Sequence, residues 1–596
     1  MSFTVKVKGV MADVLNYAAN NPDIFSHVVG TPVRQQPANS NALQLQLSPK
    51  NSLKIRMTRI AEKTLASVCL ASSAKYKDRP AFAMLKDGLL CRKVSYAQMG
   101  NRARLIGLLL RQIGTGNGGR VLLLSENCPE WPLAYFGIAL AGAVSVPLLT
   151  GFSAEQVQYL AKHSEVSAVM LSRTMAEKLK SADFSHIPLI FIDSITENGR
   201  AAEITVSVEG FEKQVPLSLG DDSEVIPRRM EGDLATIIYT SGTQGISKGV
   251  MLSGANLISS ALSSLFFVKI FPRDRFLSVL PLAHSYECSI GLLAVVISGA
   301  SITYLDRPPS PSVLLPAVKL LRPTAMITVP LFIEKIYHNA IAPKLRASRL
   351  YNCRFTRVLA IRFAGRRLLA SLGGRIRFFG IGGAPLSGDV EDFLRRAGFP
   401  YSTGYGLTEA APLVAGNVPF RFPLHSSGKA PRGVNVRIAA RFGNGEGEIQ
   451  VRGPNIMLGY YKNSEKTAET FTADGWLRTG DLGLLDKKGR LHVRGRLKAM
   501  ILGPSGENIY PEEIEGLLCS SQLVEDALVY SGEKGELVAL VSLSDAAAGA
   551  IEHAIEELRS WANKKLAVFS RLSRIEIRRE PFEKTPTMKI KRYLYV

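Results

Sequence analysis

Cysteine is scarce and scattered in this chain of 596 residues, because its six cysteines form no CxxC pair. Such spacing favours neither a disulfide framework nor a zinc site, and it is typical of a reducing compartment. The first 20 residues contain no continuous apolar run, so no secretory signal is expected. Charged residues make up 21% and hydrophobic residues 46%, which is too apolar for a disordered chain. We therefore expect a cytoplasmic protein, and the length predicts several domains.

Uninterrupted hydrophobic segments are also missing, although two uncharged stretches come close. Residues 131–154 include 24 residues without a charge, and residues 288–305 include 18. Glycine interrupts both stretches, and proline also interrupts the first. Each is therefore interpreted as a buried helix followed by a buried strand, and not as a transmembrane helix.

Short apolar runs alternate with helical periods from about residue 64 onward, as in residues 119–149. This alternation predicts an α/β fold with mostly parallel sheets covered by helices. Residues 1–60 differ, because they are rich in Asn, Gln, Ser and Pro and have no sustained period. They are interpreted either as a flexible N-terminal extension or as the product of an upstream start codon, with Met57 as the natural beginning.

Positive charge is in excess, with 73 Lys and Arg against 51 Asp and Glu, a formal net charge of +22. Between Lys335 and Gly388 there are 11 basic residues and no acidic one. Arginines alternate with apolar residues over 354–369, the pattern of a basic amphipathic helix. The segment is interpreted either as a solvated face or as a contact with anionic lipid head groups or a polyanionic cosubstrate. Nucleic acid is not expected, because no groove-reading module accompanies the charge.

The strongest local motif is residues 235–249, ATIIYTSGTQGISKG, in which an apolar strand leads into a loop rich in Ser, Thr and Gly. Glycines let backbone N–H groups turn toward phosphate oxygens, hydroxyls add donors, and Lys248 adds positive charge. The spacing is not that of a Walker loop. A solvated turn is the alternative, and the position directly after a buried strand favours phosphate binding. Residues 114–119 match GxGxxG, but they precede a strand, so they are predicted to be a turn.

The loop at 240–249 resembles the phosphate-binding signature YTSGTTGxPKG of the acyl-adenylate-forming, AMP-binding ligases, with Gln244 and Ser247 replacing Thr and Pro. This superfamily includes acyl-CoA synthetases, firefly-type luciferases and peptide-synthetase adenylation domains, and the chain is most similar to bacterial long-chain fatty acid–CoA ligases. The resemblance covers about residues 64–596. The further matching motifs are LPLAHSYE (280–287), GIGGAPL (380–386), GYGLTEAAP (404–412), GWLRTGDLG (475–483), GRLKAMILGPSGENIYPEEIE (495–515) and KTPTMKIKRYL (584–594).

The resemblance implies a large N-terminal domain of mostly parallel β-sheets flanked by helices, residues 61–497, and a small mobile α+β C-terminal domain, residues 498–596. Lys498 falls at the expected hinge between them. The small domain is expected to bring Lys589 to the acyl carboxylate and α-phosphate, and afterwards to rotate so that Gly506 faces the acyl-adenylate. Met588 stands where the family usually has Gly, a departure that bears on the backbone of this loop.

The resemblance also implies a role for each motif residue. Glu409 and Thr240 are the expected Mg²⁺ ligands, as oxygen donors suit this ion. Lys589, Thr240, Glu409 and His284 are the expected catalytic residues, with His284 gating or positioning the acyl group and the thiol. The expected nucleotide- and cosubstrate-binding residues are Ser241, Gly242, Thr243, Gly245, Lys248, Gly382, Gly383, Ala384, Tyr405, Gly406, Thr408, Asp481, Arg496, Lys498 and Gly506.

Within that set, the resemblance assigns the β/γ end of ATP to Lys248. Tyr405 is expected to stack on adenine, beside the wall formed by Gly382, Gly383 and Ala384. Asp481 and Arg496 are expected to hydrogen-bond the ribose, and an ionised carboxylate suits that task.

The implied reaction is the ATP-dependent ligation of a long-chain fatty acid to coenzyme A through an acyl-adenylate, with release of AMP and pyrophosphate. The cofactors are ATP, Mg²⁺ and coenzyme A as cosubstrate. Loading of an acyl-carrier protein is the alternative, and a non-catalytic lipid- or nucleotide-binding relative is disfavoured by the retained motif residues. The chain reads CSIGLL where amino-acid-activating relatives place an aspartate, which argues against a peptide-synthetase domain. Peripheral association with the inner face of a membrane through the basic segment 335–388 is the remaining expectation about partners.

Overall fold

The structure is a computed structural model of the chain. It describes residues 62–198, 201–208, 211–219, 227, 229–240, 248–440, 445–502, 508–521, 523–532, 535–543, 551–585 and 589–595. The N-terminal extension expected at residues 1–60 lies outside the described residues.

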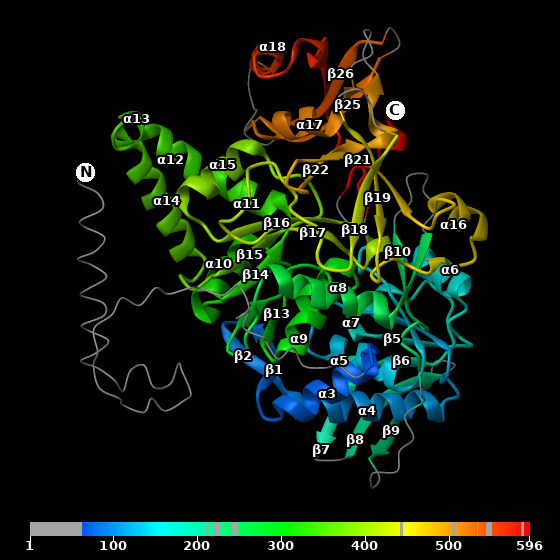
Figure 1. The fold of residues 1–596 in the computed structure, drawn as a ribbon. Helices are drawn as coiled ribbons and strands as arrows, with labels where there is room; N and C mark the ends of the chain where they lie inside the picture. Colours follow the sequence, from blue (N-terminus) through cyan, green and yellow to red (C-terminus); the bar gives the residue numbers. More distant parts are fainter. Residues whose placement is uncertain are drawn as a thin grey trace, which may run out of the picture. The chain divides into compact units, whose positions relative to one another are not determined.

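An eight-stranded sheet runs in the order β17-β16-β15-β14-β12-β13-β1-β2 (Figure 1). Its strands from β16 to β1 pair in parallel, whereas β17 and β2 pair antiparallel at the two edges. The strands are β1 Pro80–Lys86, β2 Leu89–Ser95, β12 Arg275–Leu277, β13 Ser301–Leu305, β14 Ala325–Thr328, β15 Phe378–Ile381, β16 Tyr401–Gly406 and β17 Leu413–Gly416.

A second large sheet runs in the order β20-β11-β10-β4-β3-β5-β6-β8-β7, and β9 pairs with β8. Its centre from β10 to β6 is parallel, and hairpins extend both edges. The strands are β3 Arg120–Leu124, β4 Val144–Pro147, β5 Ala168–Leu171, β6 Leu189–Phe191, β7 Thr196–Asn198, β8 Ala201–Val208, β9 Phe211–Ser218, β10 Leu234–Thr240, β11 Lys248–Ser253 and β20 Gly459–Tyr460.

Helices cover these sheets, and local capping explains where several of them begin. Four helices begin with a capping box, in which the side chain of the capping residue accepts the backbone N–H three residues later and the side chain at that later position accepts the backbone N–H of the capping residue. The capping residues are Thr64, Ser95, Ser153 and Ser253. The helices of this region are α3 Leu65–Tyr76, α4 Tyr96–Gln112, α5 Glu130–Leu140, α6 Ala154–Ser164, α7 Arg173–Lys178, α8 Gly254–Phe267, α9 Ala294–Ser298, α10 Pro311–Leu321, α11 Pro330–Ile336, α12 Ala342–Ala347, α13 Arg349–Asn352, α14 Arg357–Ser371, α15 Gly388–Ala397 and α16 Ser464–Thr470.

One apolar core joins both large sheets with α3, α4, α5, α8 and α9. A separate core packs α10, α14 and α15 against the eight-stranded sheet. The predicted α/β architecture, with helices on the faces of mostly parallel sheets, is therefore confirmed.

The uncharged stretches have the predicted structure. Residues 131–154 contain most of α5 and all of β4, and residues 288–305 contain a buried helix that runs into β13. In the described part of the chain, every helix is too short or too polar to cross a bilayer. The GxGxxG segment at 114–119 forms turns between α4 and β3, as predicted.

Smaller sheets follow in the carboxyl-terminal part of the chain. An antiparallel four-stranded sheet consists of β18 Asn435–Ala439, β19 Gly447–Arg452, β21 Leu477–Leu485 and β22 Leu491–Arg496. Beyond residue 500 the elements are β23 Ile501–Leu502, β24 Asn508–Ile509, α17 Pro511–Cys519, β25 Val524–Ser531, β26 Leu537–Leu543, α18 Ile551–Asn563 and β27 Arg574–Arg578. These last elements share an apolar core of their own. A domain boundary at residue 498, and movement about it, stay predictions.

Candidate active site

The carboxyl ends of neighbouring parallel strands bring several predicted site residues to one edge of the eight-stranded sheet. Gly382 follows β15, and Tyr405 and Gly406 are the last two residues of β16. A Cβ atom at Gly406 would lie 2.0 Å from the carbonyl oxygen of Pro412, so only glycine lets β16 approach the chain that returns as β17. This edge is where open α/β sheets bind ligands. Also found there are Gly383, Ala384, Thr408 and Glu409.

Glu409 and Lys248 come together through Tyr460, a residue that the motifs did not indicate. The Tyr460 hydroxyl donates to Glu409 Oε1 at 2.9 Å, and Lys248 Nζ lies 5.5 Å from the centroid of the Tyr460 ring. Burial lowers the pKa of Lys248, as do the charges of Lys466 and Lys498, while Glu409 opposes the shift. The site therefore already holds a lysine beside the predicted metal-ligand carboxylate.

Thr240 is the last residue of β10 and pairs with Lys248, the first residue of β11. Its hydroxyl donates to the Lys248 carbonyl oxygen at 3.5 Å. The predicted phosphate-binding residues Ser241, Gly242, Thr243 and Gly245 lie outside the described residues, so their placement stays a prediction.

Asp481 and Arg496 face each other across the β21–β22 pair, and Tyr405 completes the group. Arg496 Nε lies 2.9 Å from Asp481 Oδ1, and the Tyr405 hydroxyl donates to Asp481 Oδ2 at 2.6 Å. Burial raises the pKa of Asp481, while Arg496, Tyr405 and Lys589 act in the opposite direction. The arrangement holds a buried carboxylate next to a tyrosine ring, with a guanidinium at its side.

His284 lies in the loop that leads into the buried helix Glu287–Leu293. Its Nδ1 accepts the backbone N–H of Tyr286 at 3.2 Å, so the neutral ring carries its proton on Nε2. Burial lowers the pKa of His284 to about 4, and the charge of Lys589 adds to the shift. The imidazole is therefore a neutral donor at physiological pH, which agrees with a positioning role better than with that of a base. Ser285, the next residue, donates to the Thr408 hydroxyl at 3.5 Å.

Lys589 lies near the carboxyl terminus, next to Ile590, which forms an isolated backbone bridge with Lys584. Its backbone N–H donates to the Thr585 hydroxyl at 3.2 Å. Lys589 is exposed, and partial loss of water around its ammonium, followed by the charge of Arg496, lowers the pKa of that group. The carboxylates of Asp481, Glu512 and Glu409 oppose this shift. The structure thus brings Lys589 within electrostatic range of residues more than a hundred positions earlier.

The remaining predicted residues are placed less centrally. Lys498 is exposed in the short helix Leu497–Ala499 and acts on Lys248 through its charge. Ala384 is also exposed. Gly506 lies outside the described residues.

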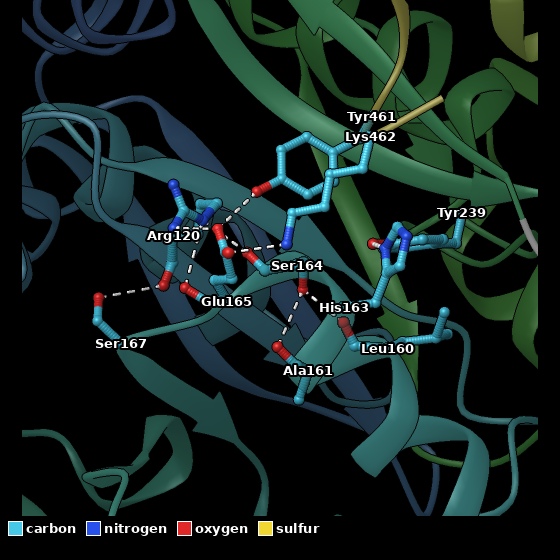
Figure 2. Close-up of polar contacts among 10 residues, drawn as sticks. All are labelled: Arg120, Leu160, Ala161, His163, Ser164, Glu165, Ser167, Tyr239, Tyr461 and Lys462. Carbon is cyan, nitrogen blue, oxygen red and sulfur yellow. Dashed lines mark hydrogen bonds and ion pairs between the residues drawn. The ribbon is translucent and has the colours of Figure 1, made fainter. Parts of the chain in front are cut away.

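A polar network at the end of α6 supports the strands that flank the phosphate loop, and sequence reasoning did not find it (Figure 2). The Glu165 carboxylate accepts from the Tyr461 hydroxyl at 3.0 Å and from Lys462 Nζ at 2.7 Å. Arg120 Nη2 donates to the same carboxylate at 3.0 Å. These bonds tie the segment after Tyr460 to α6 and β3.

His163 makes the second half of this network. Its Nδ1 lies 2.7 Å from the hydroxyl of Tyr239, the residue directly before Thr240 (Figure 2). No pattern of residue spacing reveals this contact, because its partners come from separate elements and His163 belongs to no recognised motif. Both Tyr239 and Tyr461 are neighbours in sequence of residues that line the site.

Comparison with known proteins identifies the family. The family model described as AMP-binding enzyme matches residues 70–461. The chain belongs to the AMP-binding enzyme family. It is an adenylate-forming acyl-CoA ligase, an AMP-forming acid–thiol ligase. The resemblance inferred from the motifs is therefore confirmed.

Two curated relatives illustrate the similarity. The long-chain-fatty-acid–CoA ligase FadD15 of Mycobacterium tuberculosis is 30% identical, over 76% of this chain and 77% of its own. The peroxisomal long chain acyl-CoA synthetase 6 of Arabidopsis thaliana is 30% identical, over 79% of this chain and 70% of its own. Among solved structures, ATP-bound MatB from Rhodopseudomonas palustris aligns with a TM-score of 0.67 at 24% identity, covering 89% of this chain and 98% of MatB. That likeness supports the fold.

Proposed function

We propose that this ligase joins a long-chain fatty acid to coenzyme A through an acyl-adenylate, releasing AMP and pyrophosphate. The observation that carries the proposal is the convergence of Lys589, Asp481, Arg496 and Glu409, which arise from separate parts of the chain. Relatives that are 30% identical over three quarters of the chain are named long-chain ligases, which supports the choice of acid.

The nucleotide is bound by groups of both signs. Asp481 accepts from the ribose hydroxyls, Arg496 donates to the same sugar, and the Tyr405 ring packs on adenine. Lys248 neutralises the β/γ-phosphates, which have to leave as pyrophosphate. Thr408 offers its hydroxyl to the phosphates from the same edge of the sheet.

Mg²⁺ suits the oxygen donors of this site, because it prefers one or two carboxylates together with phosphate oxygens. Glu409 and Thr240 would hold it, and the ion would neutralise charge on the phosphates. Tyr460 orients the Glu409 carboxylate through its hydrogen bond to Oε1. The described residues contain no group of three or more His, Cys, Asp or Glu side chains that could hold a metal by itself. This is compatible with a metal held mainly by its phosphate ligands.

Lys589 stabilises charge on the acyl carboxylate and α-phosphate as the carboxylate oxygen attacks phosphorus and pyrophosphate departs. His284 donates its Nε2 proton as a hydrogen bond near the acyl group. It is a poor base, because Nδ1 already accepts the Tyr286 N–H and the pKa of the ring is only about 4. In the second half-reaction the thiolate of coenzyme A attacks the acyl carbon and AMP leaves. Rotation of the small domain about Lys498, which would bring Gly506 to the adenylate, is part of this proposal.

An unsubstituted acyl chain suits the residues after His284 better than an amino acid does. Residues 288–293, CSIGLL, are buried and carry no charged side chain, and Glu287 directly precedes them. Burial raises the pKa of the Glu287 carboxyl to about 8, so this acid is protonated at neutral pH and offers no counter-ion for an ammonium group.

We also propose a cytoplasmic location, with peripheral association with a membrane through the basic segment 335–388. All six cysteines are free thiols, as a reducing compartment requires.

Pyrophosphate release by the full chain, with ATP and Mg²⁺ and with acids of increasing chain length, tests the proposed reaction. We expect kcat/KM to rise about fourfold for each CH₂ that the site buries, and an aromatic acid to be a poor substrate. With coenzyme A present, acyl-CoA and AMP should form in equal amounts. Pyrophosphate release without coenzyme A, followed by transfer of the acyl group to a carrier protein, would contradict the proposed acceptor. A preference for short or aromatic acids would contradict the proposed long-chain substrate.

A further inference from the structure

Exposed apolar side chains gather on α13, the turn after it and the first half of α14. Five large side chains of this region keep more than half of their surface in water. The group, called the docking face below, consists of Leu350 (59% exposed), Phe355 (91%), Val358 (54%), Leu359 (65%) and Phe363 (60%). Single exposed apolar residues are ordinary, but a cluster of this size on a monomer marks an interaction site.

Packing of α14 decides which side chains stay outside. Its buried residues Ala360, Ile361, Gly365 and Leu368 recur at helical spacing and contribute to the core beside α15. A Cβ atom at Gly365 would lie 2.6 Å from Ala397 Cβ, so α14 and α15 are in close contact on this side. The docking face is on the other side of the helix, and Figure 1 shows α12, α13 and α14 together at the margin of the ribbon.

Several exposed arginines lie within or beside the docking face, and four of them are Arg354, Arg362, Arg366 and Arg367. Within the part of the chain that the structure describes, none of them has a carboxylate within 4.0 Å. The guanidinium of Arg367 instead lies 5.3 Å from the ring centroid of Phe363. The face therefore joins uncompensated positive charge to apolar side chains, and no acidic residue occurs between 335 and 388 to offset it.

We propose that the docking face binds the surface of an anionic phospholipid bilayer, with the apolar side chains at the level of the head groups and the arginines on lipid phosphates. Basic amphipathic helices associate with membranes through this combination of buried apolar area and attraction to anionic lipids. An acidic protein partner would satisfy the arginines but would leave the scattered apolar side chains without a groove. The inference rests on the membrane association proposed above and names the surface that binds, and it holds whichever acid the site activates.

Sedimentation with vesicles tests the surface directly, using the full chain and vesicles of phosphatidylcholine alone or mixed equally with phosphatidylglycerol. We expect binding to the mixed vesicles at low salt, weaker binding at high salt, and little binding to phosphatidylcholine alone. The triple variant Arg362→Glu, Arg366→Glu, Arg367→Glu should lower the partition coefficient at least about a hundredfold. The variant Phe355→Ser, Leu359→Ser, Phe363→Ser should lower it about tenfold or more.

A matched control keeps the charge change equal while leaving the docking face intact. Lys213→Glu, Lys487→Glu and Lys564→Glu alter three exposed lysines outside residues 335–388, and this variant should bind vesicles within about threefold of the parent. Thermal unfolding of all variants, measured without vesicles, checks that each is folded. If the control variant lost vesicle binding as much as the triple arginine variant, net charge alone would explain the loss, and the proposal would be overturned.

Two further outcomes would also overturn it. Undiminished vesicle binding by both docking-face variants would show that another surface binds lipid. Dimerisation of the parent without vesicle binding, abolished by Phe355→Ser, Leu359→Ser, Phe363→Ser, would show that a second copy of the chain covers the face. Failure of the parent to ligate any long-chain acid would instead reject the proposed function and leave the lipid surface standing.

Discussion

His284 and Glu287 are three positions apart in the chain, and burial keeps both side chains uncharged at neutral pH. His284 gives up its proton because burial and Lys589 disfavour the cation, and Glu287 keeps its proton because burial disfavours the anion. Among the described residues, Oε1 of Glu287 accepts from the Ser278 hydroxyl at 2.6 Å, and Oε2 is buried without a hydrogen-bond partner. The segment 284–287 therefore has polar groups but no charged side chain at neutral pH.

Replacing Glu287 with glutamine should stabilise the protein, and more so as the pH rises. The carboxyl ionises near pH 4.5 when unfolded but holds its proton to about pH 8 when folded. The contribution of the Glu287 carboxyl to the free energy of unfolding is therefore fully present below pH 4.5, and it is lost progressively as the pH rises through about 8. Glutamine keeps an oxygen for Ser278 and does not ionise. Thermal unfolding at pH 5 and pH 8 should show a difference between variant and parent that grows by about 1 kcal/mol or more. The same difference at both pH values would mean that Glu287 is ionised in the folded protein, and Glu203→Gln, on an exposed strand residue, is the control.

His284 should leave no inflection in the pH profile of adenylation between pH 5 and pH 7. Its folded pKa of about 4 lies below that window, so the neutral form is present throughout. His284→Gln, which retains an acceptor and a donor, should lower kcat/KM about tenfold without changing the shape of the profile. Measured pyrophosphate release from pH 5 to pH 8 provides the test. An inflection near pH 6.5 that disappears in the variant would identify His284 as a base instead.

Strand β10 and the segment after β20 are held from outside the site by the end of one helix. Helix α6 ends at Ser164, His163 contacts Tyr239 on β10, and Glu165 contacts Tyr461, the residue after β20 (Figure 2). Tyr461 also donates its backbone N–H to the Gly249 carbonyl oxygen at 2.7 Å. Because Tyr460 orients Glu409 beside Lys248, a shift of this segment would move the carboxylate that is proposed to hold Mg²⁺.

Removing the hydroxyls that this helix end binds should weaken ATP binding without unfolding the protein. Tyr239→Phe and Tyr461→Phe each lose one hydrogen bond, so we expect KM for ATP to rise about threefold to tenfold and KM for the acid to stay unchanged. Tyr159→Phe is the matched control, since its exposed ring stacks on His163 without a hydroxyl contact in the described residues. Should all three variants have the parental KM for ATP, the network would be a surface feature only.

The carboxyl-terminal elements have a separate core, yet a turn near their end contributes a cation to a site built mainly by earlier residues. Lys589 is influenced by Arg496, Asp481, Glu512 and Glu409. Partial loss of water among these groups lowers the pKa of its ammonium, and their carboxylates favour the charged form. Lys589 can thus act on the proposed nucleotide site only while these two parts of the chain are together.

Lys589→Ala should slow formation of the acyl-adenylate about a hundredfold to a thousandfold, because it removes charge stabilisation from the transition state. Transfer of a supplied acyl-adenylate to coenzyme A should change less than about threefold. Lys591→Ala is the control, since that neighbouring lysine pairs with Glu583 at 3.0 Å and should keep full activity. Equal losses in both half-reactions would argue for a structural role of Lys589.

Much of the architecture could be predicted from the chain alone. The alternation of short apolar runs and helical periods predicted sheets covered by helices, and the uncharged stretches proved to be helix followed by strand. Local rules suffice for this, because capping residues, apolar periods and turn residues act over a few positions. The ordered motifs identified the family for a related reason, since each one preserves the side chains and spacing of a short segment.

Contacts between segments that are distant in the chain were beyond such rules. Tyr460, Glu165 and His163 belong to no recognised motif, and their partners lie on other elements. Uncharged states of His284 and Glu287 depend on how much protein surrounds each group, which only packing decides. The amino-acid order therefore determined the family, the elements and the residue types of the site. The tertiary structure decided which of those residues meet, how their charges are shifted and which apolar side chains of α14 stay in water, because burial and electrostatics depend on distances in space and not on positions along the chain.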